Sequence, residues 1–196
     1  MKKKISCILI FMLAVQFVGI KIFAADDAWS INYIGNYKTD RETYYAEVST
    51  SRALNGNRSL YIKYPNAAIE GTYLLAENTL AETVSEGEYT FSVCYRGRMP
   101  STSISLVMGS SEILFSSMGT ASDVTGESEE TGWKKLSAAV AYTGEDIGTL
   151  GIKVVGNTAG LYIDDVSLTS GETEYVSSGD FELVKQDGPA VDTAID

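Results

Sequence analysis

The sequence predicts an all-β protein, an antiparallel β-sandwich of the jelly-roll type, and three observations support this fold class. From residue 28 onward, apolar and polar residues alternate over short segments, as in strands that bury one face. Turn residues, chiefly glycine, recur between these segments at the spacing of sandwich and barrel folds. No segment after residue 28 shows a sustained apolar stripe at helical spacing.

The expected strands follow from this alternation. Residues 88–96 are an example, because every second side chain from Tyr89 to Tyr95 is apolar or aromatic, while Arg96 belongs to the polar set that points the other way. Asn55 and Gly56 supply the positive φ of a tight turn. A polar stretch at 120–131 is expected to be an exposed loop. We expect strands over residues 44–48, 59–64, 72–76, 88–96, 103–108, 112–117, 133–141, 150–155 and 160–168.

The first 25 residues have the plan of a secretory signal peptide. Three lysines precede an apolar run at 5–23, and the small residues Ala24 and Ala25 follow it. We expect cleavage after Ala25 and a secreted, extracellular protein. An uncleaved membrane anchor is the alternative, because about 20 apolar residues span a bilayer. The mature chain suffices for one sandwich domain, which we place at residues 26–170.

Charge and composition exclude several kinds of function. The net charge is -11, and every acidic residue follows the leader. An acidic surface repels nucleic acid and anionic membranes, so neutral ligands or cations are the better partners. The chain has no histidine, which excludes imidazole-based hydrolysis and zinc sites built on imidazole. Cys7 leaves with the leader, so Cys94 has no partner for an intramolecular disulfide.

Four segments carry a resemblance to a known family. They read GNRSLYI (residues 56–62), EGEYTFS (86–92), GWKKL (132–136) and LYIDDVSL (161–168). In order and spacing they resemble the galactose-binding-like jelly rolls that occur as carbohydrate-binding modules of bacterial xylanases and glucanases. The resemblance implies a module that binds plant or cell-wall polysaccharide, or an oligosaccharide, and whose partner is a catalytic domain or a second module.

Two adjacent carboxylates interrupt the apolar strand of the last segment, which is costly unless something satisfies them. The resemblance implies a structural calcium ion here, with Asp165 as the first ligand candidate and Asp164 as the second. Calcium takes several oxygen ligands at once, and backbone carbonyls of an early strand would supply others. The alternative is a bulge at which the pair is solvated or capped by backbone N–H groups.

The opening of the mature chain departs from the family. Such modules usually begin with a strand that resembles Gly-Asp-Phe-Glu, whose glutamate helps to hold the ion. Residues 29–37 lack this signature, which occurs instead at 179–182. Either a second module begins there, or the segment pairs back onto the first sandwich. We favour the first interpretation, in which residues 171–196 are a linker and the first strand of a truncated second module.

Sugar recognition needs flat apolar rings with polar groups beside them. Arg96 is one candidate, and the start of the mature chain is rich in aromatic residues. Trp133 is expected to be structural, because it follows a turn glycine and begins a core strand. The alternative for the other rings is also packing, since tyrosine favours half-buried strand positions. The candidate ligand-binding residues are Trp29, Tyr33, Tyr37, Tyr44, Tyr45 and Arg96.

The function that these observations favour is carbohydrate binding by a secreted module that is not an enzyme. The main alternative is a structural or adhesive module of a cell-surface assembly, because fold alone does not decide function. A glycosidase needs only two carboxylates, but no pair here lies in a motif whose spacing demands catalysis. A binding module should present several solvent-facing rings in line, whereas a spacer should bury them.

Overall fold

The computed structural model describes residues 28–34, 45–64, 71, 73–97, 104–125, 132–155 and 158–185. In these ranges the chain forms strands and one short 3-10 helix, so the all-β prediction is confirmed. In chain order the elements are β1 (Trp29–Ile34), β2 (Tyr45–Ser49), β3 (Ser59–Tyr64), β4 (Tyr73–Val84), β5 (Gly87–Gly97), β6 (Ile104–Met108), β7 (Ser111–Leu114), η1 (Phe115–Ser117), β8 (Ser122–Asp123), β9 (Trp133–Tyr142), β10 (Ile147–Val154), β11 (Thr158–Ser170), β12 (Thr173–Glu174) and β13 (Val184–Lys185).

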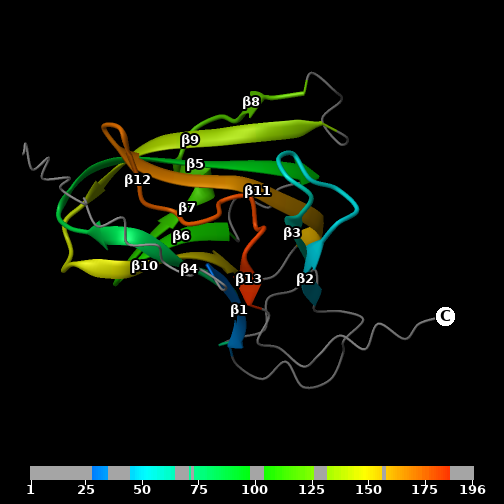
Figure 1. Ribbon diagram of the computed structural model, residues 1–196, viewed down its shortest axis with the longest axis horizontal. Helices are drawn as coiled ribbons and strands as arrows, with labels where there is room; N and C mark the ends of the chain where they lie inside the picture. The colour runs from blue at the N-terminus through cyan, green and yellow to red at the C-terminus, as the bar shows by residue number, and fades with distance from the viewer. Residues whose placement is uncertain are drawn as a thin grey trace, which may run out of the picture.

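The strands form two sheets that pack face to face, as Figure 1 shows. Sheet A has the order β13-β1-β4-β10-β6-β7, and sheet B has the order β2-β3-β11-β5-β9-β8, with β12 paired to β11. Most neighbours within a sheet are not consecutive in the chain, so the chain crosses repeatedly from one sheet to the other. The predicted antiparallel sandwich is therefore confirmed, with β1 and β13 as a parallel pair at the edge of sheet A.

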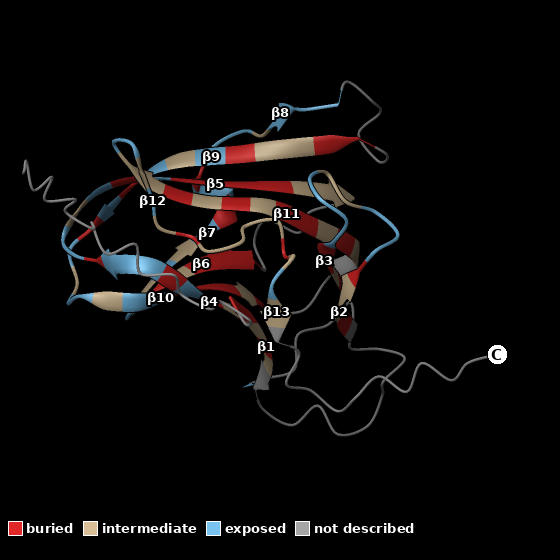
Figure 2. Cartoon of the chain, in the orientation of Figure 1, coloured by how far each residue is buried: buried red, intermediate tan, exposed pale blue. Residues whose placement is uncertain are grey.

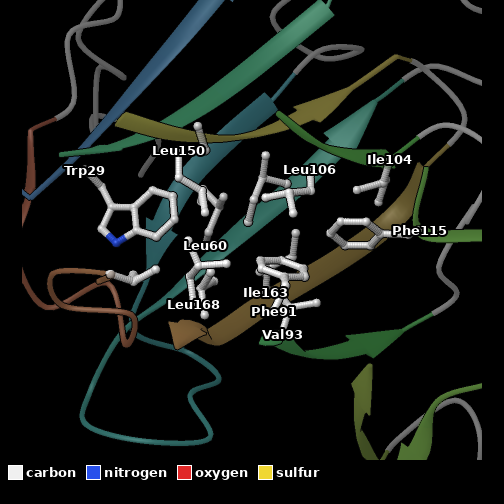
Figure 3. Packing of buried hydrophobic residues seen from close by; sticks show 14 of the residues in the cluster. Trp29, Leu60, Phe91, Val93, Ile104, Leu106, Phe115, Leu150, Ile163 and Leu168 are labelled. Atoms are coloured by element: carbon white, nitrogen blue, oxygen red, sulfur yellow. The ribbon is translucent and has the colours of Figure 1, made fainter. Parts of the chain in front are cut away.

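The core lies between the sheets, where the inward side chains of both meet (Figure 2). Phe91 of β5 is fully buried, and its ring lies 5.8 Å from that of Phe115 in η1. Leu106 and Leu150 approach from sheet A, as the close view in Figure 3 shows. Burial of each such side chain stabilises the fold by about 1.5–3 kcal/mol. The alternation read from the sequence is thus the pattern that fills the core.

The strands β1, β8, β12 and β13 were not predicted from the sequence, and two predicted strands end at other residues than expected. β4 runs on to Val84, beyond the strand expected at 72–76, because it stays paired with β10 after the apolar alternation weakens. The strand expected at 112–117 ends at Leu114, where the chain turns into η1 and directs Phe115 into the core. Tertiary contacts, rather than the local pattern, decide both boundaries.

Residues 171–185 belong to the first sandwich. The ring of Phe181 is buried and stacks on Trp29 with 4.5 Å between centroids, and β13 pairs with β1. Gly179 lies so close to β11 that a Cβ there would be 1.9 Å from the carbonyl oxygen of Val166, which leaves room only for glycine. The segment 179–182 therefore pairs back onto the sandwich and does not begin a second module, because Trp29 and Phe181 cover one another. The favoured interpretation of these residues as linker is corrected accordingly.

The leader at 1–25 and the residues after 185 lie outside the described ranges. Within those ranges, no helix has the length and apolar character that a membrane crossing requires.

Candidate functional site

Each sheet turns one face to the core and one face away from it. We name the outward face of sheet B the B face and that of sheet A the A face. Side chains alternate along a strand, so neighbours of core residues belong to the outward face. On β5, for example, Tyr95 packs against the core and Arg96 therefore lies on the B face. The B-face residues that concern the site are Glu47, Tyr61, Lys63, Cys94, Arg96, Trp133, Lys135, Tyr162 and Asp165.

A single row of side chains crosses the B face from strand to strand. Arg96 lies opposite Tyr162 of β11 on one side and opposite Trp133 of β9 on the other. Tyr162 lies opposite Tyr61 of β3, which lies opposite Glu47 of β2. Five strands at about 4.8 Å spacing make the row roughly 20 Å long. It is therefore longer than a single sugar ring.

Two tyrosines occupy the middle of this row. The rings of Tyr61 and Tyr162 lie 4.7 Å apart at an angle of 38°. Both side chains are half-buried, so part of each ring remains accessible. Burial raises the pKa of the Tyr61 hydroxyl, and the neighbouring Tyr162 and Glu47 raise it further. Tyr61 consequently stays neutral and able to donate a hydrogen bond well above neutral pH.

Trp133 is buried, but it is not part of the core between the sheets. It begins β9 as predicted, yet alternation places it on the B face, with Leu136 pointing to the core. The segment beside it is tied to β9, because the Trp133 N–H donates to Thr125 Oγ1 at 3.0 Å and its carbonyl accepts from Val124 at 2.9 Å. The burial of Trp133 agrees with the predicted structural role, and its ring is shielded outside the core between the sheets.

Asp164 is fully buried, and both of its carboxylate oxygens accept backbone N–H groups. Oδ2 accepts from Leu54 at 2.6 Å and from Asn55 at 3.2 Å, and Oδ1 accepts from Asp165 at 2.8 Å. Burial raises the pKa of Asp164 to about 6, and the three N–H donors oppose this shift. The carboxylate therefore caps the turn before β3.

Asp165 has a different partner from Asp164. It has a positive φ of 51° at the point where the pairing of β11 with β5 shifts, and its carboxylate accepts from the thiol of Cys94 at 3.7 Å. Burial raises the pKa of that thiol to about 12, with Asp165 as the next cause. The bulge with capped carboxylates, which the sequence left open as an alternative, is the arrangement that the structure shows.

These carboxylates do not fit the calcium site that the resemblance implies. Glu182, the glutamate of the displaced signature, also accepts a backbone N–H, from Asn57 at 2.5 Å. The turn thus presents N–H donors to Asp164 and Glu182, whereas calcium requires converging oxygen atoms. Among the described residues, no three Asp, Glu, Cys or His side chains are placed to hold a metal ion. This geometry does not favour calcium, and the role of Asp165 and Asp164 as ligands stays a prediction.

The sequence-based ligand candidates have different outcomes. Trp29 is 1% exposed, stacks on Phe181, and donates its indole N–H to the Ser178 carbonyl at 2.8 Å, so its ring offers no platform. That prediction was wrong because the covering segment is distant in sequence. Arg96 lies on the B face as alternation predicted, and its ligand role stays a prediction. The side chains of Tyr33 and Tyr45, and the whole of Tyr37 and Tyr44, lie outside the description.

Sequence reasoning missed Tyr61 and Tyr162, the best-placed rings of the B face. Each lies between two core residues, Tyr61 between Leu60 and Ile62, so the alternation already directed both outward. The same signal applies to Lys63 and Lys135. What the sequence does not contain is the register that brings the two tyrosines side by side.

A hollow of about 560 Å³ lies at the turns that follow β6 and β9, away from the B face. Its lining includes the carboxylate residues Glu145 and Asp146, together with Tyr142. Tyr142 is 3% exposed and donates its hydroxyl to the Glu145 carbonyl at 2.7 Å. Without an exposed ring, this hollow lacks the platform that a sugar needs.

No family model matches the chain, and no curated protein matches it in sequence. Among solved structures, it is similar to the CBM22-1 and GH10 modules of endo-1,4-β-D-xylanase 10B from Clostridium thermocellum, complexed with xylohexaose, at 18% identity and a TM-score of 0.44 over 78% of the chain. It spans 28% of that protein.

Two further structures are isolated modules. The CBM22-1 xylan-binding domain of Xyn10C from Paenibacillus barcinonensis has 14% identity and a TM-score of 0.43, covering 76% of this chain and 86% of its own. The module CBM6cm-2 of lichenase 5A from Cellvibrio mixtus, in complex with cellotriose, has 11% identity and a TM-score of 0.33, covering 72% and 98%. These are modules of the class that the sequence resembles.

Proposed function

We propose that this chain is a carbohydrate-binding module that holds a polysaccharide or oligosaccharide across the B face. One observation carries the proposal: Tyr61 and Tyr162 lie side by side, partly accessible, in the middle of a row with charged side chains at its sides. Aromatic faces pack against the C–H faces of pyranose rings, and charged groups orient the hydroxyls. An adhesive spacer has no need for rings in line on an open sheet.

The roles within the row follow from the chemistry of each group. Tyr61 and Tyr162 supply the apolar platform, Glu47 accepts hydrogen bonds from sugar hydroxyls, and Arg96 donates them. A single shallow site of this kind binds weakly, so useful affinity requires attachment to an enzyme or to another module. The leader at 1–25 would export the module to where such polymers occur.

The spacing of the two accessible carboxylates described around the row supports binding without catalysis. Glu47 of β2 and Asp165 of β11 are two strands apart, about 10 Å, and Asp165 lies three residues further along β11 than the row, about another 10 Å. The carboxyl pairs of glycosidases are about 5–9.5 Å apart. This pair is too widely separated to act on one glycosidic bond.

The test is affinity electrophoresis and calorimetry with soluble xylan, β-glucan, mannan and galactan. Tyr162→Ala removes one ring of the platform, and Tyr73→Ala removes a half-buried tyrosine from the A face as a matched control. Loss of one stacked ring should weaken binding by about 1 kcal/mol, or roughly fivefold. Binding to none of these polymers, or equal losses in the two variants, would refute the proposal.

A further inference from the structure

The balance of charges on the B face differs from the balance in the chain as a whole. The protein contains 26 acidic and 15 basic residues. Among the described residues around the tyrosine pair, however, the exposed and half-buried charges are three cations and two carboxylates. They are Lys63, Arg96 and Lys135 against Glu47 and Asp165. Asp164 adds no accessible charge, because it is sealed beneath the turn whose N–H groups it accepts.

Arg96 and Lys135 have no carboxylate partner among the described residues. Lys153 on the A face shows the ordinary situation in such an acidic protein, since its ammonium lies 2.7 Å from a Glu112 oxygen. Asp123 is on the neighbouring strand β8, but it lies opposite Lys134, whose side chain alternates to the other face. On the B face, the nearest carboxylate by strand order is Asp165, and Cys94 lies between it and Lys135 and responds to both charges. Glu88 is on the same face but eight residues from Arg96 along β5, roughly 26 Å. Two cations are thus left beside the platform.

The position of Arg96 decides what these cations can do. It lies directly opposite Tyr162 in the row, one strand spacing of about 4.8 Å away. Lys135 of β9 lies opposite Cys94, and Cys94 is two residues from Arg96 on the same side of β5. A sugar stacked on Tyr162 would therefore carry its substituents toward two positive charges. A guanidinium has the planar fork that pairs with a carboxylate through two hydrogen bonds.

We infer that the B face selects polysaccharides that carry uronic acids, with Arg96 and Lys135 receiving the carboxylate of a sugar held on Tyr61 and Tyr162. The inference rests on the proposed function and narrows its ligand class. The inferred ligand is anionic, whereas the net charge favours neutral ligands or cations. A local pair of cations outweighs distant carboxylates, because salt screens charges over about 10 Å.

The deciding experiment uses one polymer in two forms. Glucuronoxylan is compared with the same preparation after chemical reduction of its uronic carboxyls to alcohols, which keeps the backbone and removes the charge. We expect the wild-type protein to bind the reduced polymer about tenfold more weakly, and added salt to weaken binding only of the native polymer. Equal affinity of the wild-type protein for the two forms would overturn the inference. If Tyr162→Ala then weakened the binding of both forms, the proposed function would still stand.

Variants test the residues themselves. Arg96→Gln and Lys135→Gln should each lose most of the preference for native over reduced glucuronoxylan, and Lys153→Gln on the A face should keep it. Melting curves establish that each variant folds, and the comparison of the two polymers on wild-type protein needs no variant at all. A preference that survives both B-face substitutions would refute the assigned residues, and binding of neither polymer would refute the proposed function itself. Tighter binding of dextran sulfate than of glucuronoxylan would exclude carboxylate selection.

Discussion

The two outward faces of this sandwich carry the same kinds of side chain, but these side chains have different partners on each face. On the A face, Lys153 binds Glu112 and lies 4.9 Å above the ring of Tyr73. A Cβ added to Gly151 would come within 2.7 Å of a Leu75 methyl, so the strands there are also closely covered. On the B face, the rings of Tyr61 and Tyr162 lie together, and Arg96 and Lys135 have no carboxylate partner among the described residues. Lys153 of the A face is thus paired, whereas two B-face cations remain for the ligand that we propose.

The comparison shows why whole-chain properties mislead about a binding face. A net charge of -11 describes the average surface, but a ligand meets only the groups within a few ångströms. Tyrosine content is equally uninformative, because Tyr73 is covered by a lysine whereas Tyr162 is not bonded to any cation among the described residues. Position in the sheet, rather than composition, distinguishes Tyr162 from the covered Tyr73.

The largest expected effect is a loss of stability at the segment 179–185, on which both faces depend. Phe181→Ala should lower the free energy of unfolding by about 3–5 kcal/mol, because it removes a fully buried ring stacked on Trp29. Urea denaturation measures the change. The neighbouring Leu183→Ala, at a residue 39% exposed, should cost less than about 1 kcal/mol. Similar losses in both variants would show that the segment 179–185 does not seal the sandwich.

The next effect concerns the buried carboxylate under the B face. Asp164→Ala should cost about 2–3 kcal/mol, since the N–H groups of Leu54 and Asn55 lose their acceptor. Asp165→Asn removes the adjacent charge, which accepts only from a weak thiol donor, and keeps a residue that tolerates the positive φ, so it should cost less than about 1 kcal/mol. Unfolding in urea again distinguishes them. If Asp165 proved the costlier residue, the assignment of Asp164 as the cap would fail.

The same carboxylate predicts a pH dependence. Asp164 has a pKa of about 6 when folded, whereas an unfolded aspartate has about 3.9, so between these values the folded protein holds a proton that the unfolded chain has released. Stability from this group is therefore greatest below about pH 4 and falls as the pH rises to about 6. The free energy of unfolding of wild type relative to Asp164→Asn, measured from pH 4 to pH 7, should decline. A rising difference would contradict the raised pKa.

A smaller effect separates the two faces directly. Glu112→Gln releases Lys153 on the A face and should cost only about 0.2–1 kcal/mol, because the pair is exposed to solvent. Binding of glucuronoxylan to the B face should remain unchanged in calorimetry. A marked change in affinity would place the ligand on the A face instead.

The smallest expected effect is none at all. Because Asp164 and Glu182 face backbone N–H donors, a chelator should leave the melting temperature of the protein unchanged, as measured by calorimetry with and without EDTA. A fall of several degrees that calcium restores would show that these carboxylates rearrange around an ion.

The sequence predicted the sandwich because alternation and turn residues are local properties. It also placed Arg96 on the polar side of its strand, and the same alternation implied an outward Tyr61. It could not separate Trp29 from a surface ring, because the indole's hydrogen-bond partner, Ser178, is 149 residues away. Nor could it distinguish a calcium ligand from a cap at Asp164, because that depends on the direction of N–H groups at Leu54, 110 residues earlier. Register and loop direction are tertiary properties.

The stacking of Trp29 on Phe181 has a consequence for the order in which the protein can form. The first described strand of the sandwich is covered by the last described segment, which is synthesised after the rest of the described sandwich. Until that segment emerges, a large indole and one edge of sheet A remain open to solvent and to chaperones. The edge of sheet A at β1 is therefore completed only after almost the whole described polypeptide has been synthesised.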